Sequence, residues 1–256
     1  ILYTELRGVD GIGVADLTKE QVKNVKEMLD KEGLKVWSIG SPIGKIDLKD
    51  DFEPHLDKFK RVIETAQITG ANKIRLFSFY GYDGSDAARD EVLRRMNRFV
   101  EVNEGSGVLL CHENEKDIYG EQAKECRELM EAFYGDHFKA IFDFANFVQA
   151  KQDTLGAYEL LKDYIAYIHV KDALWDNGSV VPAGMGDGNV AVILKKLFEK
   201  GYNGFLSLEP HLFNFSGFAG LERDKEAIAG GEVKVLSGAE AFALAHDSLV
   251  KILGEM

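Results

Sequence analysis

Four residues with side chains that bind divalent metals stand at the ends of four apolar segments. They are Glu113 in segment 108–113, Asp143 in 138–143, His169 in 165–170 and Glu209 in 204–209. Each segment has the length and apolar content of a buried β-strand. Charged side chains are seldom buried unless they are paired. The four positions therefore suggest that the polar ends of neighbouring strands share one partner.

The spacing of these residues supports a common site. They fall 30, 26 and 40 residues apart, so each stands at the end of the next strand along the chain. Three carboxylates in one place would repel one another and raise their own pKa values, and a divalent cation removes that conflict. Three oxygen ligands and one imidazole suit Mn²⁺, Mg²⁺, Co²⁺ or Zn²⁺. We predict one metal ion; a cluster of solvated or salt-bridged side chains is the alternative.

Strand patterns and helix patterns alternate along the whole chain. The expected strands are 2–7, 35–40, 73–79, 108–113, 138–143, 165–170 and 204–209, and helix-period segments follow them, the last at about 238–253. Thr18 and Gln21 form a capping box before the first helix, and Gly33 and Gly70 end the first two. Seven βα units of this kind predict parallel strands.

Parallel strands form either an open doubly wound sheet or a closed barrel. An open sheet would normally carry a Gly-rich phosphate turn after its first strand, and the chain has none with that spacing. We therefore predict a (β/α)8 TIM barrel over residues 1–256 as a single domain. Barrel closure requires eight strands, so we expect one further βα unit before residue 1.

Alternation of side chains along the strands places the polar ends inside the barrel. If Glu113 points inward, then Cys111 does so too, and His112 faces the helices. The same pattern turns Asp143, His169 and Glu209 inward and leaves apolar neighbours outside, with His112 as the one polar exception. The four candidate ligands are thus expected in the barrel mouth, where barrel enzymes keep their active sites.

The composition excludes several classes of partner. The 256 residues carry a net charge of −12, which repels phosphate backbones and argues against nucleic-acid binding. Two cysteines, Cys111 and Cys126, do not form a disulfide framework, so we expect a reducing, cytoplasmic location. No apolar run approaches the roughly 18 residues of a membrane span, so no membrane partner is expected.

Six short motifs resemble the sugar phosphate isomerase/epimerase family, whose members have a xylose isomerase-like barrel. They are SPIGK (41–45), HENEKDIYG (112–120), DFANF (143–147), HVKD (169–172), PAGMGDG (182–188) and LEPH (208–211). The similarity covers essentially the whole chain, and the motifs occur in the family's order. It implies that Glu113, Asp143, His169 and Glu209 bind one metal ion and that the two glutamates also act as acid and base.

The implied reaction is an isomerisation or epimerisation of a sugar or sugar phosphate. A metal that chelates a carbonyl and the adjacent hydroxyl stabilises an enediolate, and two carboxylates can remove and return the proton. Loss of a β-hydroxyl from the same intermediate would instead give dehydration of a keto-cyclitol or keto-sugar. A barrel that binds sugar and metal without turnover is the alternative from outside the enzymes.

Two departures from the family pattern bear on the substrate. Asn146 replaces a His three residues after the metal Asp, and Trp175 replaces an Arg six residues after the metal His. Both argue against a free-ketohexose 3-epimerase. HVKD is more similar to the inosose dehydratase branch, where Lys171 would hold a substrate oxygen and Asp172 would orient it. Barrel-type apurinic endonucleases use additional His ligands that are not evident here.

Other polar residues are candidates for substrate binding. Lys45 and Arg75 could bind an anionic group, with an exposed loop lysine and an Arg75–Glu5 pair as the simpler alternatives. Asn146 and His211 lie close to predicted ligands. The aromatic segment with Phe213, Phe215 and Phe218 is expected to form a lid, a local hydrophobic plug or the contact of a homodimer as in relatives.

Overall fold

The computed structural model describes residues 1–212 and 236–256, which form two compact units. The first unit comprises Ile1–Glu113, Asp117–Gly120 and Glu125–Ala140; the second comprises Asn114–Lys116, Glu121–Lys124 and Ile141–Met256. The aromatic segment predicted as a lid, plug or dimer contact begins at Phe213 and lies outside the described residues. Each unit is described by itself below.

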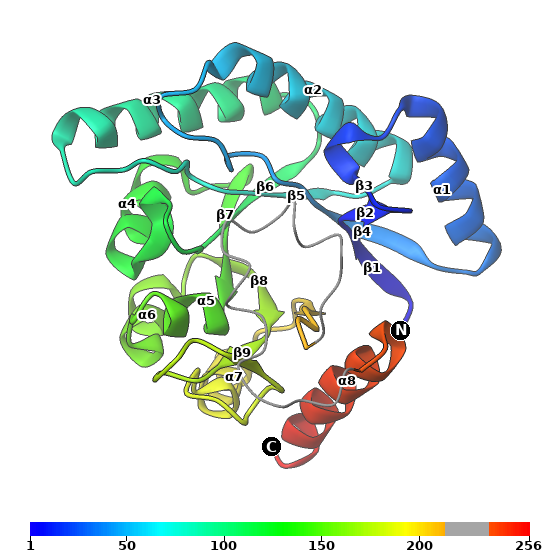
Figure 1. The fold of residues 1–256 in the computed structure, drawn as a ribbon, viewed down its shortest axis with the longest axis vertical. Coiled ribbons are helices and arrows are strands. Elements are labelled where there is room, and N and C mark those ends of the chain that lie inside the picture. The colour runs from blue at the N-terminus through cyan, green and yellow to red at the C-terminus, as the bar shows by residue number, and fades with distance from the viewer. Residues whose placement is uncertain (213–235) are drawn as a thin grey trace. The chain divides into compact units, whose positions relative to one another are not determined.

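The first unit is built on four parallel strands. Strand β4 pairs with β1 and β5, and β5 pairs with β6. In Figure 1 helices α2 and α3 run side by side over these strands. The strands are β1 (Tyr3–Leu6), β4 (Lys35–Gly40), β5 (Lys73–Leu76) and β6 (Leu109–Glu113), and the helices are α1 (Lys19–Lys31), α2 (Phe52–Thr69), α3 (Asp86–Asn103) and α4 (Ala123–Phe133).

The first unit also contains two short strands and two 3₁₀ turns. Strands β2 (Gly8–Val9) and β3 (Ile12–Gly13) form a two-stranded antiparallel hairpin that the sequence patterns did not predict. Single 3₁₀ turns occur at η1 (Val14–Asp16) and η2 (Tyr119–Glu121). These elements leave the predicted order of strands and helices unchanged.

The second unit contains a parallel strand pair and a short hairpin. Strand β8 pairs with β11, and β9 pairs with β10 in antiparallel fashion. Strand β7 contributes residues to both units. The strands are β7 (Phe138–Asp143), β8 (Ile165–Val170), β9 (Asp172–Ala173), β10 (Val180–Val181) and β11 (Leu206–Leu208), and the helices are α5 (Phe144–Gln149), α6 (Thr154–Leu161), α7 (Val190–Glu199) and α8 (Gly238–Gly254).

The main sheet has seven strands in the order β1-β4-β5-β6-β7-β8-β11, which is their order along the chain. Sequential parallel strands with helices between them are the arrangement of a TIM barrel, so the predicted fold class is confirmed. The predicted strands at 35–40, 138–143 and 165–170 have those bounds in the structure. Among the described residues, no helix is long and apolar enough to cross a membrane.

Helix ends follow the capping signals in the sequence. Thr18 forms the predicted capping box with Gln21 at the start of α1, and Gly70 ends α2 in the left-handed conformation. Ser85 and Ser237 are the N-caps of α3 and α8. The hydroxyl of each accepts a hydrogen bond from a backbone N–H of the first helical turn. The helices therefore begin where local side-chain chemistry starts them.

The loop after β4 is fixed by two buried polar residues of the first unit. Arg95 donates to the carbonyls of Leu48 at 2.8 Å and Asp50 at 3.1 Å. His55 Nε2 accepts the Gly44 N–H at 2.8 Å, and burial lowers the pKa of His55 to about 4. His55 is therefore neutral in the folded protein near pH 7, with Nε2 as the acceptor.

We expect His55→Gln to reduce the loss of stability at acid pH. The pKa of His55 is lower in the folded state than the usual 6.5, so the unfolded state binds the extra proton and stability falls as the pH drops from about 6.5 to about 4. The shift corresponds to about 3 kcal/mol at most. Urea unfolding at several pH values measures it, with His246→Gln on the exposed side of α8 as the control. An unchanged pH slope in His55→Gln would contradict the assignment.

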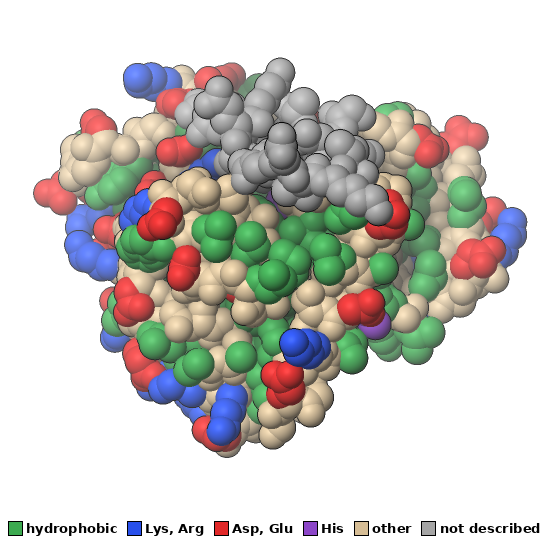
Figure 2. Space-filling view, turned by 60° about the horizontal axis from the view of Figure 1, so that its bottom comes forward, with side chains coloured by type: hydrophobic (Ala, Val, Ile, Leu, Met, Phe, Trp, Pro, Cys, Tyr) green, Lys and Arg blue, Asp and Glu red, His purple; other side chains and the backbone are tan. Residues whose placement is uncertain are grey.

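The drawn surface mixes charges of both signs. Figure 2 shows Lys and Arg side chains interspersed with Asp and Glu side chains on this face. Ion pairs also form along the helices, as between Arg127 and Glu131 at 2.7 Å and between Arg94 and Glu91 at 2.7 Å. Exposed pairs of this kind contribute at most about 1 kcal/mol each. They keep the protein hydrated and do not create a basic patch on this face.

Candidate metal centre

Three candidate ligands stand at strand ends of the second unit. Asp143 is the last residue of β7, His169 is the penultimate residue of β8, and Glu209 follows β11 directly. The register pairs His169 with Ser207, which places Glu209 one pleat beyond it on the same side of the neighbouring strand. Alternation along the strands therefore brings the three side chains to one place, as the sequence predicted.

The three side chains form a tight, buried cluster. His169 Nδ1 lies 3.1 Å from Glu209 Oε1 and 4.0 Å from Asp143 Oδ2. One potential ligand atom from each residue lies within 4.8 Å of the other two. Asp143 and His169 are completely buried, and Glu209 is 6% exposed. This separation suits ligands arranged around a single ion.

Lys171 is the cation of this cluster. Its Nζ lies 3.3 Å from Asp143 Oδ2 and 3.2 Å from Glu209 Oε2, and the side chain is buried. The two ionised carboxylates carry two negative charges, and Lys171 supplies one positive charge. Removing such charges from water costs several kcal/mol per ion unless they are compensated. The arrangement therefore favours a further cation beside the carboxylates.

Asp143 is held by its own local structure. Its Oδ1 accepts the Asn146 N–H at 2.8 Å and thereby caps α5, which leaves Oδ2 directed to the cluster. Asn114 Nδ2 donates to the Asp143 carbonyl, and Asn114 Oδ1 accepts the Asp143 N–H. Asn146 Nδ2 donates to the Asn114 carbonyl at 2.9 Å. Asn146, a predicted substrate ligand, thus also supports the backbone around Asp143.

Glu113, the remaining candidate ligand, ends β6 in the first unit and is 1% exposed. Arg75 Nη1 lies 3.2 Å from Glu113 Oε2, and Arg75 Nη2 donates to the Gly40 carbonyl at 3.2 Å. The strand register pairs Arg75 with Cys111, so Arg75 and Glu113 face the same side of neighbouring strands. The sequence considered a substrate anion or Glu5 as partners of Arg75 and missed Glu113.

Two cations of the first unit lie against one aromatic ring. Lys45 Nζ is 4.4 Å and the Arg75 guanidinium carbon is 5.0 Å from the centre of the Phe77 ring. Lys45 is half-buried at the end of the SPIGK turn. A cation over an aromatic face is stabilised by the ring quadrupole. Phe77 was not singled out from the sequence, where it looked like an ordinary strand residue.

His112 has a structural position beside Glu113. Its Nε2 lies 2.9 Å from Ser78 Oγ, and Ser78 Oγ also accepts the Gly120 N–H. Burial lowers the pKa of His112 to about 3, so the ring is neutral at physiological pH. His112 and Ser78 therefore connect the end of β6 to η2, so part of the HENEKDIYG motif stabilises the fold.

Two further candidates, His211 and Asp172, have partners in the second unit. His211 lies near Glu209, and Asp172 accepts hydrogen bonds from the backbone. His211 Nε2 lies 3.8 Å from Glu209 Oε2. The Asp172 carboxylate is completely buried and accepts the backbone N–H groups of Ala173, Gly184, Gly186 and Gly188 at 2.9–3.0 Å. Through these hydrogen bonds, Asp172 fixes the backbone of the PAGMGDG loop. Its predicted substrate contact stays a prediction.

We expect Asp172→Asn to destabilise the protein by about 3 kcal/mol. An amide nitrogen would face two of the four N–H donors, and each buried donor left without an acceptor costs about 1–3 kcal/mol. Urea unfolding measures the change. Asp176→Asn, at an exposed position of the turn between β9 and β10, is the matched control and should leave stability unchanged. An equally stable Asp172→Asn variant would show that the four hydrogen bonds do not hold the loop.

The donor set fits a divalent metal ion. Two carboxylates and a neutral imidazole are hard or borderline ligands, and together they suit Mn²⁺, Mg²⁺, Co²⁺ and Zn²⁺. A buried group of this kind, with its oxygen atoms directed toward the His169 ring, is compatible with one ion. The buried cluster of Asp143, His169 and Glu209 could therefore hold a metal ion.

Solved structures with the same fold include enzymes and metal-binding proteins. They are the "IOLI protein" with a zinc atom (TM-score 0.73, 16% identity, 99% of this chain and 88% of that chain), a D-tagatose 3-epimerase-like protein (0.68, 15%, 93% and 85%) and the probable 3-DHS dehydratase AsbF from Bacillus anthracis (0.61, 21%, 75% and 76%). At these identities the likeness concerns the fold. A search of curated proteins finds no match to the chain.

A family model described as "Xylose isomerase-like TIM barrel" matches residues 4–236. The match covers the seven strands of the main sheet, apart from Tyr3 at the start of β1. It also covers all four candidate ligands. The chain belongs to the xylose isomerase-like TIM barrel family.

Proposed function

We propose that the protein is a divalent-metal-dependent isomerase or epimerase acting on a sugar or sugar phosphate. The single observation that carries this proposal is the buried cluster of Asp143, His169 and Glu209 with Lys171 beside it. A carboxylate-rich cluster at strand ends is suited to hold both a metal and a polyhydroxylated substrate.

Glu113 completes the proposed set of ligands. It is a buried carboxylate at the end of β6, the strand that precedes β7 in the order of the sheet. When bound, a divalent cation would hold a carbonyl and an adjacent hydroxyl oxygen of the substrate and lower the pKa of the neighbouring C–H bond.

Glu113 and Glu209 are the proposed acid and base. They come from β6 and from the end of β11, and β7 and β8 separate these strands in the sheet order. One glutamate accepts the proton of the C–H bond next to the carbonyl, and the other donates a proton to the opposite face or to the neighbouring carbon. The first outcome is epimerisation and the second is aldose–ketose isomerisation.

The remaining candidates would bind substrate oxygens. Lys171 is placed to hold a hydroxyl near Asp143 and Glu209, and His211 lies beside Glu209. Lys45 and Arg75 are proposed to bind an anionic or hydroxyl group of the substrate. Asn146 and Asp172 are proposed to act through the backbone that they hold as much as through direct contact.

Dehydration is the second candidate, and the position of Lys171 favours it. Its ammonium group, 3.2 Å from Glu209 Oε2, could protonate a leaving hydroxyl after Glu209 has taken the C–H proton. The products are then water and an unsaturated ketone, and no oxidant is needed. A probable dehydratase shares this fold, so dehydration is tested beside isomerisation and epimerisation.

Proton exchange tests the proposal. The Mn²⁺-loaded protein is incubated in D₂O with ketoses, ketose phosphates and keto-cyclitols, and NMR measures deuterium at the carbon next to the carbonyl. Deuterium without loss of water supports an isomerase or epimerase, whereas an unsaturated product supports the dehydratase. Protein treated with a chelator is the control and should show no exchange. Absence of exchange over the whole panel would favour a binding protein without turnover.

A further inference from the structure

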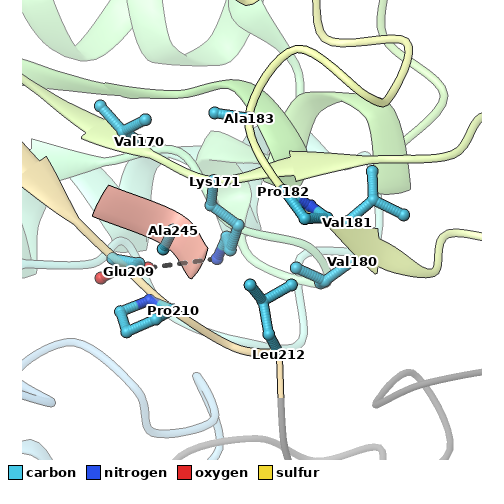
Figure 3. Close-up of a pocket in the computed structure, with 10 residues that line it drawn as sticks. All are labelled: Val170, Lys171, Val180, Val181, Pro182, Ala183, Glu209, Pro210, Leu212 and Ala245. Carbon is cyan, nitrogen blue, oxygen red and sulfur yellow. Dashed lines mark hydrogen bonds and ion pairs between the residues drawn. The ribbon is translucent and has the colours of Figure 1, made fainter. Parts of the chain in front are cut away.

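A small pocket adjoins the candidate metal centre in the second unit. Lys171 and Glu209 form part of its lining (Figure 3), and the space inside it that a water-sized group can occupy is about 10 Å³. A cavity of roughly 10–15 Å³ by this measure holds about one water molecule. The pocket is therefore of a size to receive one small group, such as a methyl group, of a substrate whose reacting part lies at the cluster.

Most of the pocket's described lining is apolar. Of the ten described residues that line it, eight have apolar side chains, among them Val180, Val181, Leu212 and Ala245. Figure 3 shows Val180, Val181 and Leu212 on the Lys171 side of the Lys171–Glu209 ion pair, and Ala245 beside Glu209. Among the described lining residues, only Lys171 and Glu209 have charged side chains. A substrate held at this ion pair therefore meets a hydrocarbon wall next to it.

Asp172 holds the strand and the loop that carry part of the wall. Val181 on β10 pairs with Asp172 on β9, and Val180 pairs with Ala173. The Asp172 carboxylate also binds the loop that continues from Val181, through the N–H groups of Gly184, Gly186 and Gly188. A preformed wall gains more from a matching ligand than one that must be ordered on binding.

We propose that this pocket is a specificity subsite for an apolar carbon substituent, and that the substrate is a deoxy keto-sugar whose methyl group occupies it. This inference rests on the proposed isomerase, epimerase or dehydratase reaction. A hydroxyl group against Val180, Val181 and Leu212 would find no polar partner among these three side chains, and a methyl group would gain from covering apolar surface.

The expected preference is moderate. A hydrophobic pocket discriminates between substrates that differ by one small group by about 10–100-fold. The kcat/KM for exchange should therefore be higher by about that factor for a 6-deoxyketose than for the ketohexose of the same configuration. The difference should appear mainly in KM, because the methyl group is remote from the reacting C–H bond and binds equally in the ground and transition states.

Matched ketose pairs test the subsite. The Mn²⁺-loaded protein is assayed for deuterium exchange with 6-deoxyketoses, with the parent ketohexoses and with erythrulose, a four-carbon ketose without the distal carbons. The inference expects the deoxy sugar of a pair to exchange faster. Equal exchange of both members, or faster exchange of the parent sugars, overturns it.

Two variants probe the wall directly. Ala245→Leu fills the pocket and should lower kcat/KM for the deoxy sugar about tenfold while erythrulose exchange is unchanged. Val181→Thr keeps the shape of the side chain and replaces a methyl group by a hydroxyl group. It should therefore reduce the preference for the deoxy sugar without filling the pocket. This variant tests the subsite even if Ala245→Leu folds poorly. Val192→Thr, at an exposed position on α7, is the matched control.

The outcomes separate the two proposals. If no ketose, erythrulose included, exchanges deuterium, the proposed function fails and the subsite fails with it. If ketoses exchange but the deoxy sugars are not preferred and Val181→Thr behaves as wild type, the proposed function stands and the apolar subsite alone is refuted. A preference that Val181→Thr diminishes and Val192→Thr preserves supports both.

Discussion

Replacing Glu209 by Gln is expected to lower the rate of deuterium exchange by about 10³-fold, because general acid–base catalysis contributes about 10²–10⁴-fold. The amide keeps the shape of the side chain but cannot accept the C–H proton. Glu113→Gln should have a comparable effect, since the two glutamates are proposed to share the proton transfers. The measurement is kcat for exchange in D₂O with saturating Mn²⁺.

The metal content of both variants has to be measured with the rate. Glu209 contacts His169 at 3.1 Å and Lys171 at 3.2 Å, so the substitution also alters the proposed metal site. Exchange that stays low at Mn²⁺ concentrations that fill the site identifies the loss as catalytic. Glu199→Gln, at an exposed position on α7, is the control. Near-normal turnover in either site variant would rule out the mechanism with two glutamates.

Replacing His169 by Ala is expected to weaken Mn²⁺ binding by at least about 100-fold. Loss of residues that only support a ligand already costs about 10–100-fold in metal affinity, and removal of a ligand itself should cost at least as much. Equilibrium dialysis with metal analysis measures the affinity. Wild-type protein should bind about one equivalent per chain, as a single shared site requires.

Thermal unfolding gives an independent measurement of the same prediction. At a Mn²⁺ concentration of about 100 times the wild-type Kd, binding should stabilise the wild-type protein by about 2.7 kcal/mol and the His169→Ala variant by about 0.4 kcal/mol. The increment caused by Mn²⁺ is compared, because the smaller side chain lowers the baseline stability by itself. His246→Ala is the control. Equal increments in both proteins would exclude His169 as a ligand.

The strand patterns predicted the framework of the site well. The segments KVWSIG, FKAIFD and IAYIHV have strand bounds in the structure that agree with the sequence, because each is apolar on both faces and bounded by a turn or a polar run. The inward alternation also brought Asp143, His169 and Glu209 together. A strand buried on both faces has to be apolar along nearly its whole length. The apolar run in the sequence is therefore enough to locate it.

Two local features escaped the strand and helix patterns. Helix α5 was missed because Phe144–Gln149 spans only six residues, too few for a helical period, and because Asp143 both ends β7 and caps α5. Strand β5 ends at Leu76 although the pattern continues to Phe79. Phe79 has a φ of 69°, and the Phe77 carbonyl lies where a side chain on Gly44 would be, so the backbone turns to meet the SPIGK loop.

Side-chain partners were harder to predict than strand ends. Arg75 pairs with Glu113 because the register of β5 and β6 puts Arg75 opposite Cys111, and no single-strand pattern contains that register. The resemblance of HVKD predicts that Asp172 orients a substrate oxygen, but it gives no sign of the hydrogen bonds that Asp172 accepts from the backbone. Its four backbone partners lie on either side of a hairpin that is invisible to helix and strand periodicity.

The loop that Asp172 holds determines where the protein can be re-engineered. A methyl group on Gly186 or Gly188 would come within 2.6 Å of Asp172 Oδ1, so neither position tolerates a side chain while the hydrogen bonds persist. Met185 directly precedes Gly186, and 68% of its surface is exposed. A library of variants restricted to Met185 would therefore diversify the rim of the loop at little cost in folding, whereas one that includes the glycines would consist mostly of unfolded chains.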